Sequence, residues 1–293
     1  MHQKTLRASC HIRGVGLHSG KDARLTLLPA PVNHGIVFRV RQAGREVEIP
    51  AKVPFITRTL LSTSIGRDGI EVCTIEHLMA ALSGLEVDNA IVVVEGAEVP
   101  VLDGSALGFV QHVEAVGLKL QPASRWYLRI LAPIEVQDGD RSAGLYPAAH
   151  PSYSMRIDYP HKAVGTQELS VPLTRQHFIR ELAACRTFGF VSELETLQAN
   201  GFALGAGLDN AVGLAADGTI LNPEGLRCAD EFVRHKLLDA VGDMYLAGHH
   251  VLGEFRGVKS GHSIHVLLLE QLFAMPECWE LVPAAELSQA RAV

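Results

Sequence analysis

The chain has 293 residues, of which 47% are hydrophobic and 20% are charged, a balance that is typical of a folded globular protein and argues against disorder. The formal net charge of −6 gives no support for a nucleic-acid partner. No apolar run approaches the ~20 residues that span a bilayer, so we expect no integral membrane segment.

The cysteines and the N-terminal residues favour a reducing cellular compartment for this protein. The five cysteines are scattered, odd in number and include no C-x-x-C pair, which is typical of buried thiols in a reducing environment. The first residues lack the basic and then apolar layout of a signal peptide. We therefore predict a cytoplasmic protein, with a monomer as the default expectation.

The first half of the chain is predicted to form short strands and two helices. Apolar and β-branched patterns predict strands at 6–12, 23–28, 36–40, 59–65 and 89–95, and helices at 75–83 and 105–116. Asp103-Gly104-Ser105 is the predicted turn and N-cap of the second helix.

The second half repeats this plan. Strands are predicted at 126–130, 143–146, 153–159 and 251–256, and helices at 231–246 and 263–273. E-H-L-M-A-A-L (76–82) is echoed by R-H-K-L-L-D-A (234–240). We therefore predict an α+β fold of two related domains, residues 1–122 and 123–293. Each is a small β-sheet layered with helices, and the active site lies at the interface between the domains.

A segment near residues 188–220 has no counterpart in the first half. It is rich in glycine and carries apolar residues such as Phe190 and Phe202. The pattern alone leaves three interpretations open: a loop that completes the fold, a lid, or an apolar channel.

Two predicted helices carry residues that could bind a metal. His235 and Asp239 are four residues apart, so they project from one face of a helix. Glu76-His77 lies on the matching helix of the first half. Two imidazoles and a carboxylate suit zinc better than calcium or magnesium. Ordinary helical capping or ion pairing is an equal alternative on spacing alone.

Three further acidic or basic groups could take part in proton transfer. Glu76, next to a ligand, could be a general base, or simply an acid favoured by the helix dipole. His262, in Lys259-Ser260-Gly261-His262 at a helix start, could give a proton to a leaving amine, or belong to an ordinary turn. Asp243 could orient an imidazole, or be a solvated helical acid.

Six ordered motifs resemble one family. They are G-V-G-L-H-S-G (14–20), T-I-E-H-L-M-A-A-L-S-G-L (74–85), V-P-V-L-D-G-S-A (99–106), C-R-T-F-G-F (185–190), F-V-R-H-K-L-L-D-A-V-G-D (232–243) and K-S-G-H (259–262). The chain resembles the zinc-dependent UDP-3-O-acyl-N-acetylglucosamine deacetylases of lipid A biosynthesis over nearly its whole length. The resemblance implies hydrolysis of the N-acetyl group of UDP-3-O-(3-hydroxyacyl)-N-acetylglucosamine, with release of acetate.

The resemblance also implies roles for individual residues. The metal ligands for Zn²⁺ would be His77, His235 and Asp239. Glu76 would be the general base that activates the zinc water. Thr187 would help zinc to stabilise the oxyanion. His262, charged with the help of Asp243, would be the acid and electrostatic stabiliser.

A second implied set binds the substrate. Lys236 and Lys259 would meet the diphosphate, Tyr159 after Asp158 would stack on uracil, and His18 would lie near the sugar. The segment 188–211 would form the passage for the acyl chain. The implied substrate-binding residues are His18, Leu61, Asp158, Tyr159, Phe188, Lys236 and Lys259.

Four positions depart from the family pattern. Arg141 stands where a lysine is expected, Pro160-His161-Lys162 follows a different order, Ser62 replaces a cysteine, and His265 replaces an asparagine. Two other functions stay open: a catalytically silent sensor of sugar nucleotides or lipids, and a zinc amidase or peptidase. The absence of H-E-x-x-H disfavours the common peptidase pattern. Iron could occupy the same ligands, and the acyl-chain length is not determined by sequence.

Overall fold

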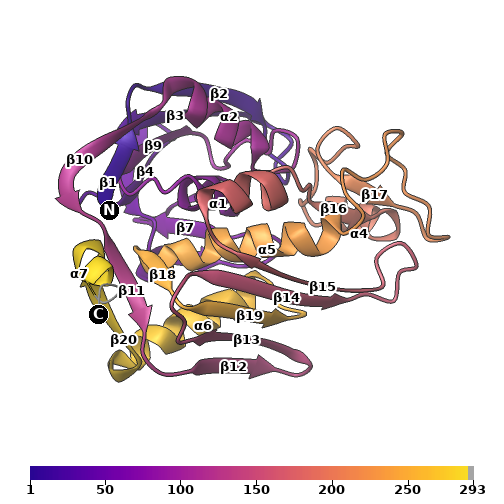
Figure 1. The fold of residues 1–293 in the computed structure, drawn as a ribbon. Helices are drawn as coiled ribbons and strands as arrows, with labels where there is room; N and C mark the ends of the chain where they lie inside the picture. The colour runs from indigo at the N-terminus through magenta and orange to yellow at the C-terminus, as the bar shows by residue number, and fades with distance from the viewer. Residues whose placement is uncertain (290–293) are drawn as a thin grey trace.

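Two five-stranded sheets with the same strand order form the frame of the protein (Figure 1). The computed structural model describes residues 1–289. The first sheet has the order β2 (Cys10–Val15), β3 (Asp22–Pro29), β9 (Ala90–Glu95), β4 (Ile36–Gln42), β5 (Arg45–Pro50). The second has the order β12 (Ile134–Asp138), β13 (Arg141–Tyr146), β19 (Glu254–Val258), β14 (Ser152–Asp158), β15 (Thr166–Pro172).

The two sheets also share their strand directions. In each, only the third and fourth strands are parallel, β9 with β4 and β19 with β14, whereas the other neighbours are antiparallel. A helix precedes the third strand in both cases. The repeated plan that the sequence predicts is therefore present in the structure, and the α+β fold class is confirmed.

Two helices lie between the sheets, one from each half of the chain (Figure 1). They are α1 (Glu76–Gly84) and α5 (Glu231–Met244), and they pack directly against each other. Every residue of α1 is buried, so this helix has no solvent face. At Gly242 a Cβ atom would lie only 2.1 Å from the carbonyl oxygen of Glu76, so the close approach of the two helices requires glycine there.

Two more helices lie beside this pair. α2 (Leu107–Val116) packs on α1 and β2, and α6 (His262–Ala274) packs on α5, β12 and β13. The predicted cap is wrong by one residue: the N-cap of α2 is Ala106, and Oγ of Ser105 accepts a hydrogen bond from the N–H of Leu107 at 3.1 Å just before it. In the part of the chain described here, no helix combines the length and the apolar character needed to cross a bilayer.

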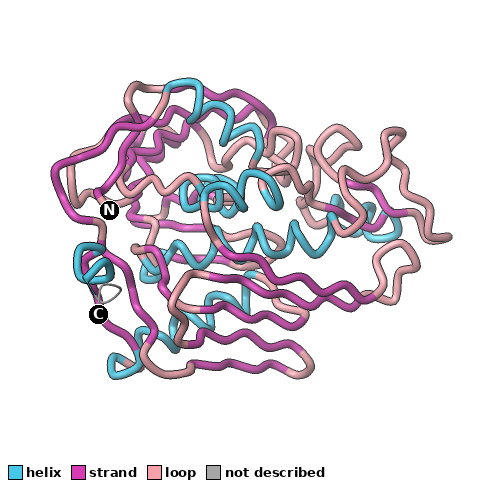
Figure 2. Tube along the Cα trace, viewed as in Figure 1, coloured by secondary structure: helices cyan, strands magenta, loops and turns pink. Residues whose placement is uncertain are grey.

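Smaller elements complete the fold (Figure 2). The small sheets pair β1 (His2–Leu6) with β10 (Leu118–Ser124), β16 (Phe188–Phe190) with β17 (Val212–Leu214), β11 (Trp126–Ile130) with β18 (His250–Leu252) and β20 (Trp279–Pro283), and β7 (Ser64–Arg67) with β6 (Ile56–Arg58) and β8 (Ile70–Val72). The remaining α-helices of the described residues are α3 (Arg175–His177), α4 (Val191–Ala199) and α7 (Ala284–Gln289). Short 3-10 helices lie at η1 (Val53–Phe55), η3 (Tyr245–Ala247) and η4 (Pro276–Cys278), and a π-helix at η2 (Phe178–Leu182). β16, α4 and β17 belong to the predicted insertion, which extends from the frame mostly as loop.

Several predicted boundaries are wrong. The predicted strand 6–12 is two strands, because β1 ends at Leu6 and β2 begins at Cys10. Most of the predicted strand 59–65 is irregular, and only its end belongs to β7. Strands such as β10 and β15 were not predicted, because their partly exposed residues lack an apolar alternation that stands out from the background. The division into domains at residues 122 and 123 stays a prediction, and it falls inside β10.

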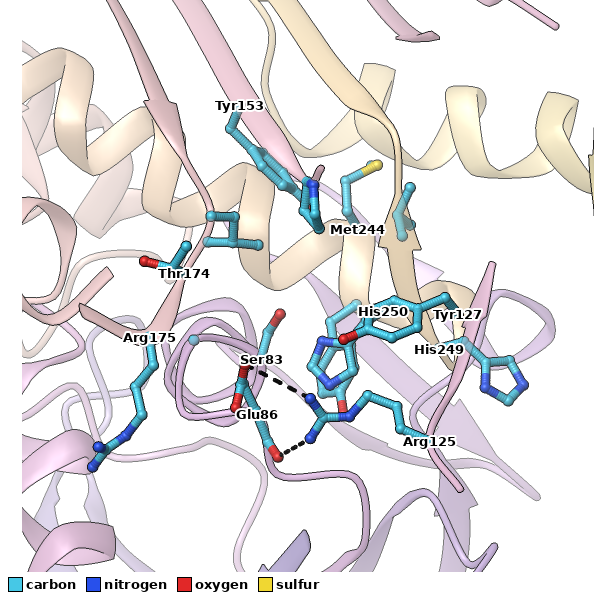
Figure 3. Close-up of a pocket in the computed structure, with 15 residues that line it drawn as sticks. Ser83, Glu86, Arg125, Tyr127, Tyr153, Thr174, Arg175, Met244, His249 and His250 are labelled. Carbon is cyan, nitrogen blue, oxygen red and sulfur yellow. Dashed lines mark hydrogen bonds and ion pairs between the residues drawn. The ribbon is translucent and has the colours of Figure 1, made fainter. Parts of the chain in front are cut away.

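A buried arginine joins the two halves of the chain. Arg125, between β10 and β11, has a side chain that is 1% exposed. Its Nε and Nη2 donate to the two carboxylate oxygens of Asp88 at 2.7 and 2.8 Å, and Nη2 also donates to the carbonyl of Glu86 at 2.8 Å. It borders a cavity of about 40 Å³ that none of the predicted site residues lines (Figure 3). The bidentate pair therefore has a structural role.

Replacing Arg125 by alanine is expected to lower the free energy of unfolding by about 3–5 kcal/mol, because Asp88, whose side chain is only 12% exposed, would keep its charge without this cationic partner. Urea unfolding followed by circular dichroism measures the change. Arg129→Ala is the matched control, since Arg129 and Glu280 form a pair that is 40% and 41% exposed. We expect about 0–1 kcal/mol for the control, and equal losses for the two variants would contradict the structural role of Arg125.

Candidate metal centre and active site

Three ligand atoms converge where α1 and α5 touch. Nε2 of His77 lies 3.5 Å from Oδ1 of Asp239, and Nε2 of His235 lies 3.4 Å from the same oxygen. The two imidazole rings are 5.0 Å apart between centroids and nearly perpendicular. All three side chains are buried. The structure thus brings together the three residues predicted as metal ligands, two from α5 and one from α1.

The contacts around these residues fit a bound cation. Oδ1 of Asp239 is buried and has no hydrogen-bond partner among the described residues, which is costly for a carboxylate oxygen unless a cation occupies the site. Nδ1 of His235 lies 3.0 Å from the carbonyl of Cys185 and donates to it, so Nε2 keeps its lone pair for a metal. The other oxygen of Asp239 accepts a hydrogen bond from Lys236 at 2.7 Å.

The electrostatics of the triad agree with this interpretation. Burial lowers the pKa of His235 to about 4, against the opposing effect of Asp239, so the imidazole is neutral and able to bind a metal at pH 7. Burial alone would raise the pKa of Asp239, but His235 and Lys236 outweigh it and hold that pKa well below its usual range. A neutral imidazole and an ionised carboxylate are the forms in which these groups bind Zn²⁺.

Glu76 stands at the start of α1, next to the ligand His77. Its Oε2 accepts a hydrogen bond from the backbone N–H of Thr63 at 3.0 Å, which fixes the carboxylate. Its Oε1 faces Nε2 of His262 across 3.9 Å. Burial raises the pKa of Glu76 above its ordinary value, although His262 and His77 oppose the shift. A carboxylate with a raised pKa is a better proton acceptor at neutral pH.

A buried network holds His262, the first residue of α6. Nδ1 of His262 donates to Oδ2 of Asp243 at 2.8 Å, so Nε2 is the nitrogen that faces Glu76. Oδ1 of Asp243 accepts from the hydroxyl of Thr63 at 2.6 Å. Burial would lower the pKa of His262, but the charge and hydrogen bond of Asp243 outweigh it and raise the pKa to about 9. The imidazole is therefore positively charged at neutral pH.

An apolar cavity of about 370 Å³ lies within the insertion. It is lined mainly by aliphatic and aromatic residues of the insertion. Four predicted site residues also line it: His18, Leu61, Thr187 and Phe188. The loop 14–20 docks onto this segment, because the N–H groups of Leu204 and Gly205 donate to the carbonyls of His18 and Leu17. The cavity is compatible with an apolar channel, one of the three interpretations left open, and that interpretation stays a prediction.

The other predicted substrate residues lie in three places. Tyr159 packs edge-on against Phe188 at 5.7 Å between centroids, near the cavity. Lys259 directly follows β19, where Nζ is 3.0 Å from a carboxylate oxygen of both Asp140 and Asp158. Lys236 is engaged with Asp239.

Three residues of the site were not predicted. Thr63 contacts Glu76, Asp243 and His262, yet it lies in a stretch interpreted as a strand. Cys185 acts through its carbonyl, which no side-chain pattern reveals. Glu98 is buried and accepts from the backbone N–H groups of His18 and Ser19 at 2.8 and 2.9 Å, so it fixes the loop 14–20. The sequence signal that could have identified Glu98 is an acidic residue among the apolar residues of 97–101.

Comparison with known proteins decides the family. The family model for UDP-3-O-acyl N-acetylglycosamine deacetylase (LpxC) matches residues 3–274. The chain belongs to this family. It is therefore an enzyme, a deacetylase of the hydrolase class, and the resemblance inferred from the motifs is confirmed.

Three similar proteins illustrate the match. Each is named UDP-3-O-acyl-N-acetylglucosamine deacetylase. The protein of Myxococcus xanthus is 44% identical over 97% of this chain and 90% of its own length. Those of Shewanella frigidimarina and Pseudomonas entomophila are both 43% identical over 96% of this chain, and over 92% and 93% of their own lengths.

Proposed function

We propose that this enzyme removes the N-acetyl group of UDP-3-O-(3-hydroxyacyl)-N-acetylglucosamine, releasing acetate, in the lipid A pathway of the cytoplasm. The observation that carries the proposal is the arrangement of His77, His235 and Asp239 beside Glu76 and His262, in a chain of this family. A binding protein would not need a buried base and a charged acid beside a metal site. Zn²⁺ is the proposed metal because two imidazoles and one carboxylate are its usual catalytic ligands.

The chemistry divides among the residues of the site. A bound Zn²⁺ would supply Lewis-acid polarisation and lower the pKa of a water to about 7. Glu76, held by the N–H of Thr63, takes a proton from the attacking water. The hydroxyl of Thr187 donates to the developing oxyanion, as the resemblance implies.

His262 completes the reaction at the leaving group. Its charge stabilises the transition state, and Nε2 gives a proton to the departing amine, while Nδ1 stays bonded to Asp243. We propose that Lys236, Lys259, Asp158, Tyr159 and His18 bind the nucleotide sugar, and that Leu61 and Phe188 contact the acyl chain in the apolar cavity.

Incubation with UDP-3-O-(3-hydroxyacyl)-N-acetylglucosamine tests the function directly. Mass spectrometry is expected to show the loss of one acetyl group, suppressed by a zinc chelator and restored by added Zn²⁺. Restoration by Fe²⁺ but not Zn²⁺ would identify iron as the metal. Unchanged substrate, with metal bound and UDP still binding, would favour the catalytically silent sensor.

Shortening the acyl chain of the substrate is expected to reduce kcat/KM. Each buried CH₂ group that is lost removes about 0.8 kcal/mol of transfer free energy, or about four-fold in kcat/KM if all of it is used to position the amide. Initial rates on a series of 3-hydroxyacyl chains measure the effect. Equal rates on short and long chains would contradict the assignment of the cavity to the acyl chain.

Asp243→Asn is expected to move the basic limb of the pH profile of kcat/KM to lower pH. The acid form of His262 is active, so activity is present below its pKa and is lost as pH rises through about 9. Without the charge of Asp243, burial dominates and lowers that pKa. Asp68→Asn, an exposed change of the same charge, is the control. An unchanged basic limb would contradict the pairing.

A further inference from the structure

Two imidazoles share one carboxylate oxygen behind the proposed acid. Nδ1 of His265 lies 2.8 Å from Oδ2 of Asp243, the oxygen that also accepts from Nδ1 of His262 at 2.8 Å. His262 and His265 are three residues apart on α6, and their rings are nearly perpendicular. His265 and Asp243 are both 0% exposed. The position of His265 is therefore not explained by solvent contact or by binding of a ligand.

The second nitrogen of His265 is also occupied. Nε2 lies 3.0 Å from Oγ of Ser260, and the ring packs edge-to-face with Phe255 at 5.5 Å between centroids. Because Nδ1 donates to a carboxylate, a neutral His265 must accept at Nε2, and the hydroxyl of Ser260 is the donor within reach. The alternative partner of that hydroxyl, the thioether of Met155 at 3.2 Å, is a weaker acceptor. Both ring nitrogens therefore have a partner, and the contacts fix the imidazole in one orientation.

Three hydrogen bonds hold the carboxylate of Asp243 in one orientation. Thr63 donates to Oδ1, and the two histidines donate to Oδ2. Without His265, Oδ2 would lose the one partner that is not itself part of the proposed proton transfer. The carboxylate could then rotate about its terminal torsion, which is broad for aspartate, and His262 would rotate with it.

We propose that His265 is a positioning residue, whose imidazole fixes the carboxylate of Asp243 and thereby aims Nε2 of His262 at the leaving group. This inference rests on the proposed function, because it assigns His265 to the orientation of the proposed acid. His265 itself does not touch the reacting atoms. It acts through its hydrogen bond to Asp243, and Ser260 in turn forms a hydrogen bond with His265.

Two amide substitutions distinguish the contribution of Nδ1 of His265 from that of Nε2. In His265→Asn the side-chain N–H group can replace Nδ1, so the bond to Asp243 can persist. In His265→Gln the amide extends to the position of Nε2, so the contact with Ser260 can persist without the one to Asp243. His265→Leu removes both. Leu272→Ala, at a buried position of α6 outside the network, controls for a general loss of packing.

Steady-state kinetics on the metal-loaded enzyme is the first test. We expect His265→Gln and His265→Leu to lose about 10- to 100-fold in kcat, as for other outer hydrogen-bond partners, with KM and metal content unchanged. His265→Asn is expected to retain most of kcat, and Leu272→Ala all of it. Equal kcat for the Asn and Gln variants, or wild-type kcat for the Leu variant, would overturn the proposal.

Nuclear magnetic resonance of protein labelled with ¹⁵N-histidine is the second test, and it does not depend on activity. The low-field Nδ1–H protons of the wild type should include one from His262 and one from His265, each assigned by its loss or shift in a variant. His265→Asn should remove one and leave the other in place, whereas His265→Gln should also shift or broaden the signal of His262. An unchanged His262 signal in the Gln variant would overturn the proposal. If the wild type showed both signals but no deacetylation, the proposed function would fail and the positioning contact would stand.

Discussion

Replacement of Glu76 by glutamine is expected to lower kcat about 10²- to 10⁴-fold, the range of general acid–base catalysis, while the metal content stays that of the parent enzyme. The amide oxygen of glutamine can still accept the N–H of Thr63, so the side chain should keep its place. Only the ability to take a proton is lost. Rates with the nucleotide-sugar substrate, together with elemental analysis of the dialysed protein, measure both quantities.

The control for this substitution is Glu277→Gln, an exposed change of the same type near the end of α6. It should leave kcat and metal content unaltered. A Glu76→Gln enzyme that turns over at the parent rate would remove Glu76 from the mechanism. One that loses its metal would instead place Glu76 among the ligands.

Substitution of Asp239 by asparagine should remove the metal and, with it, essentially all activity. Oδ1 of Asp239 faces Nε2 of both histidines and has no other partner in the described residues. A neutral amide supplies neither the charge nor the two equivalent oxygens of the carboxylate. Loss of an outer partner of a metal ligand already costs about 10- to 100-fold in affinity, so loss of a ligand should cost more.

Metal content after dialysis at several free Zn²⁺ concentrations gives the change in affinity. Asp68→Asn is again a suitable control because it lies on the surface far along the chain from α5. Activity that returns at high Zn²⁺ would confirm that the defect is in binding. Unchanged affinity would exclude Asp239 as a ligand.

The sequence predicts the parts of the site that lie on helices. His235 and Asp239 follow from their spacing of four, and Glu76-His77 follows from the matching helix in the first half. Helical periodicity fixes which residues share a face but does not specify which helices touch. That α1 meets α5 depends on Gly242, where the close approach leaves no room for a side chain.

The remaining parts depend on contacts between residues far apart in the chain. Thr63 lies in irregular backbone, 180 residues from Asp243, and no local pattern connects them. His265 could be recognised in the sequence only as a departure from the family pattern, because its partners Asp243 and Ser260 meet it only in the folded protein. The small strands of the insertion have too few residues to show a period.

The contact between α1 and α5 also links metal affinity to conformational stability. His77 belongs to one helix, and His235 and Asp239 belong to the other, so the complete ligand set exists only while the helices are docked. By mass action, a metal that binds only this state stabilises it by RT ln(1 + [M]/Kd), where [M] is the free metal concentration. Because both helices are buried in the core, their separation is part of global unfolding and would release the metal. Gly242 is not itself a proposed ligand. A larger residue there would weaken metal binding by holding His77 away from His235 and Asp239.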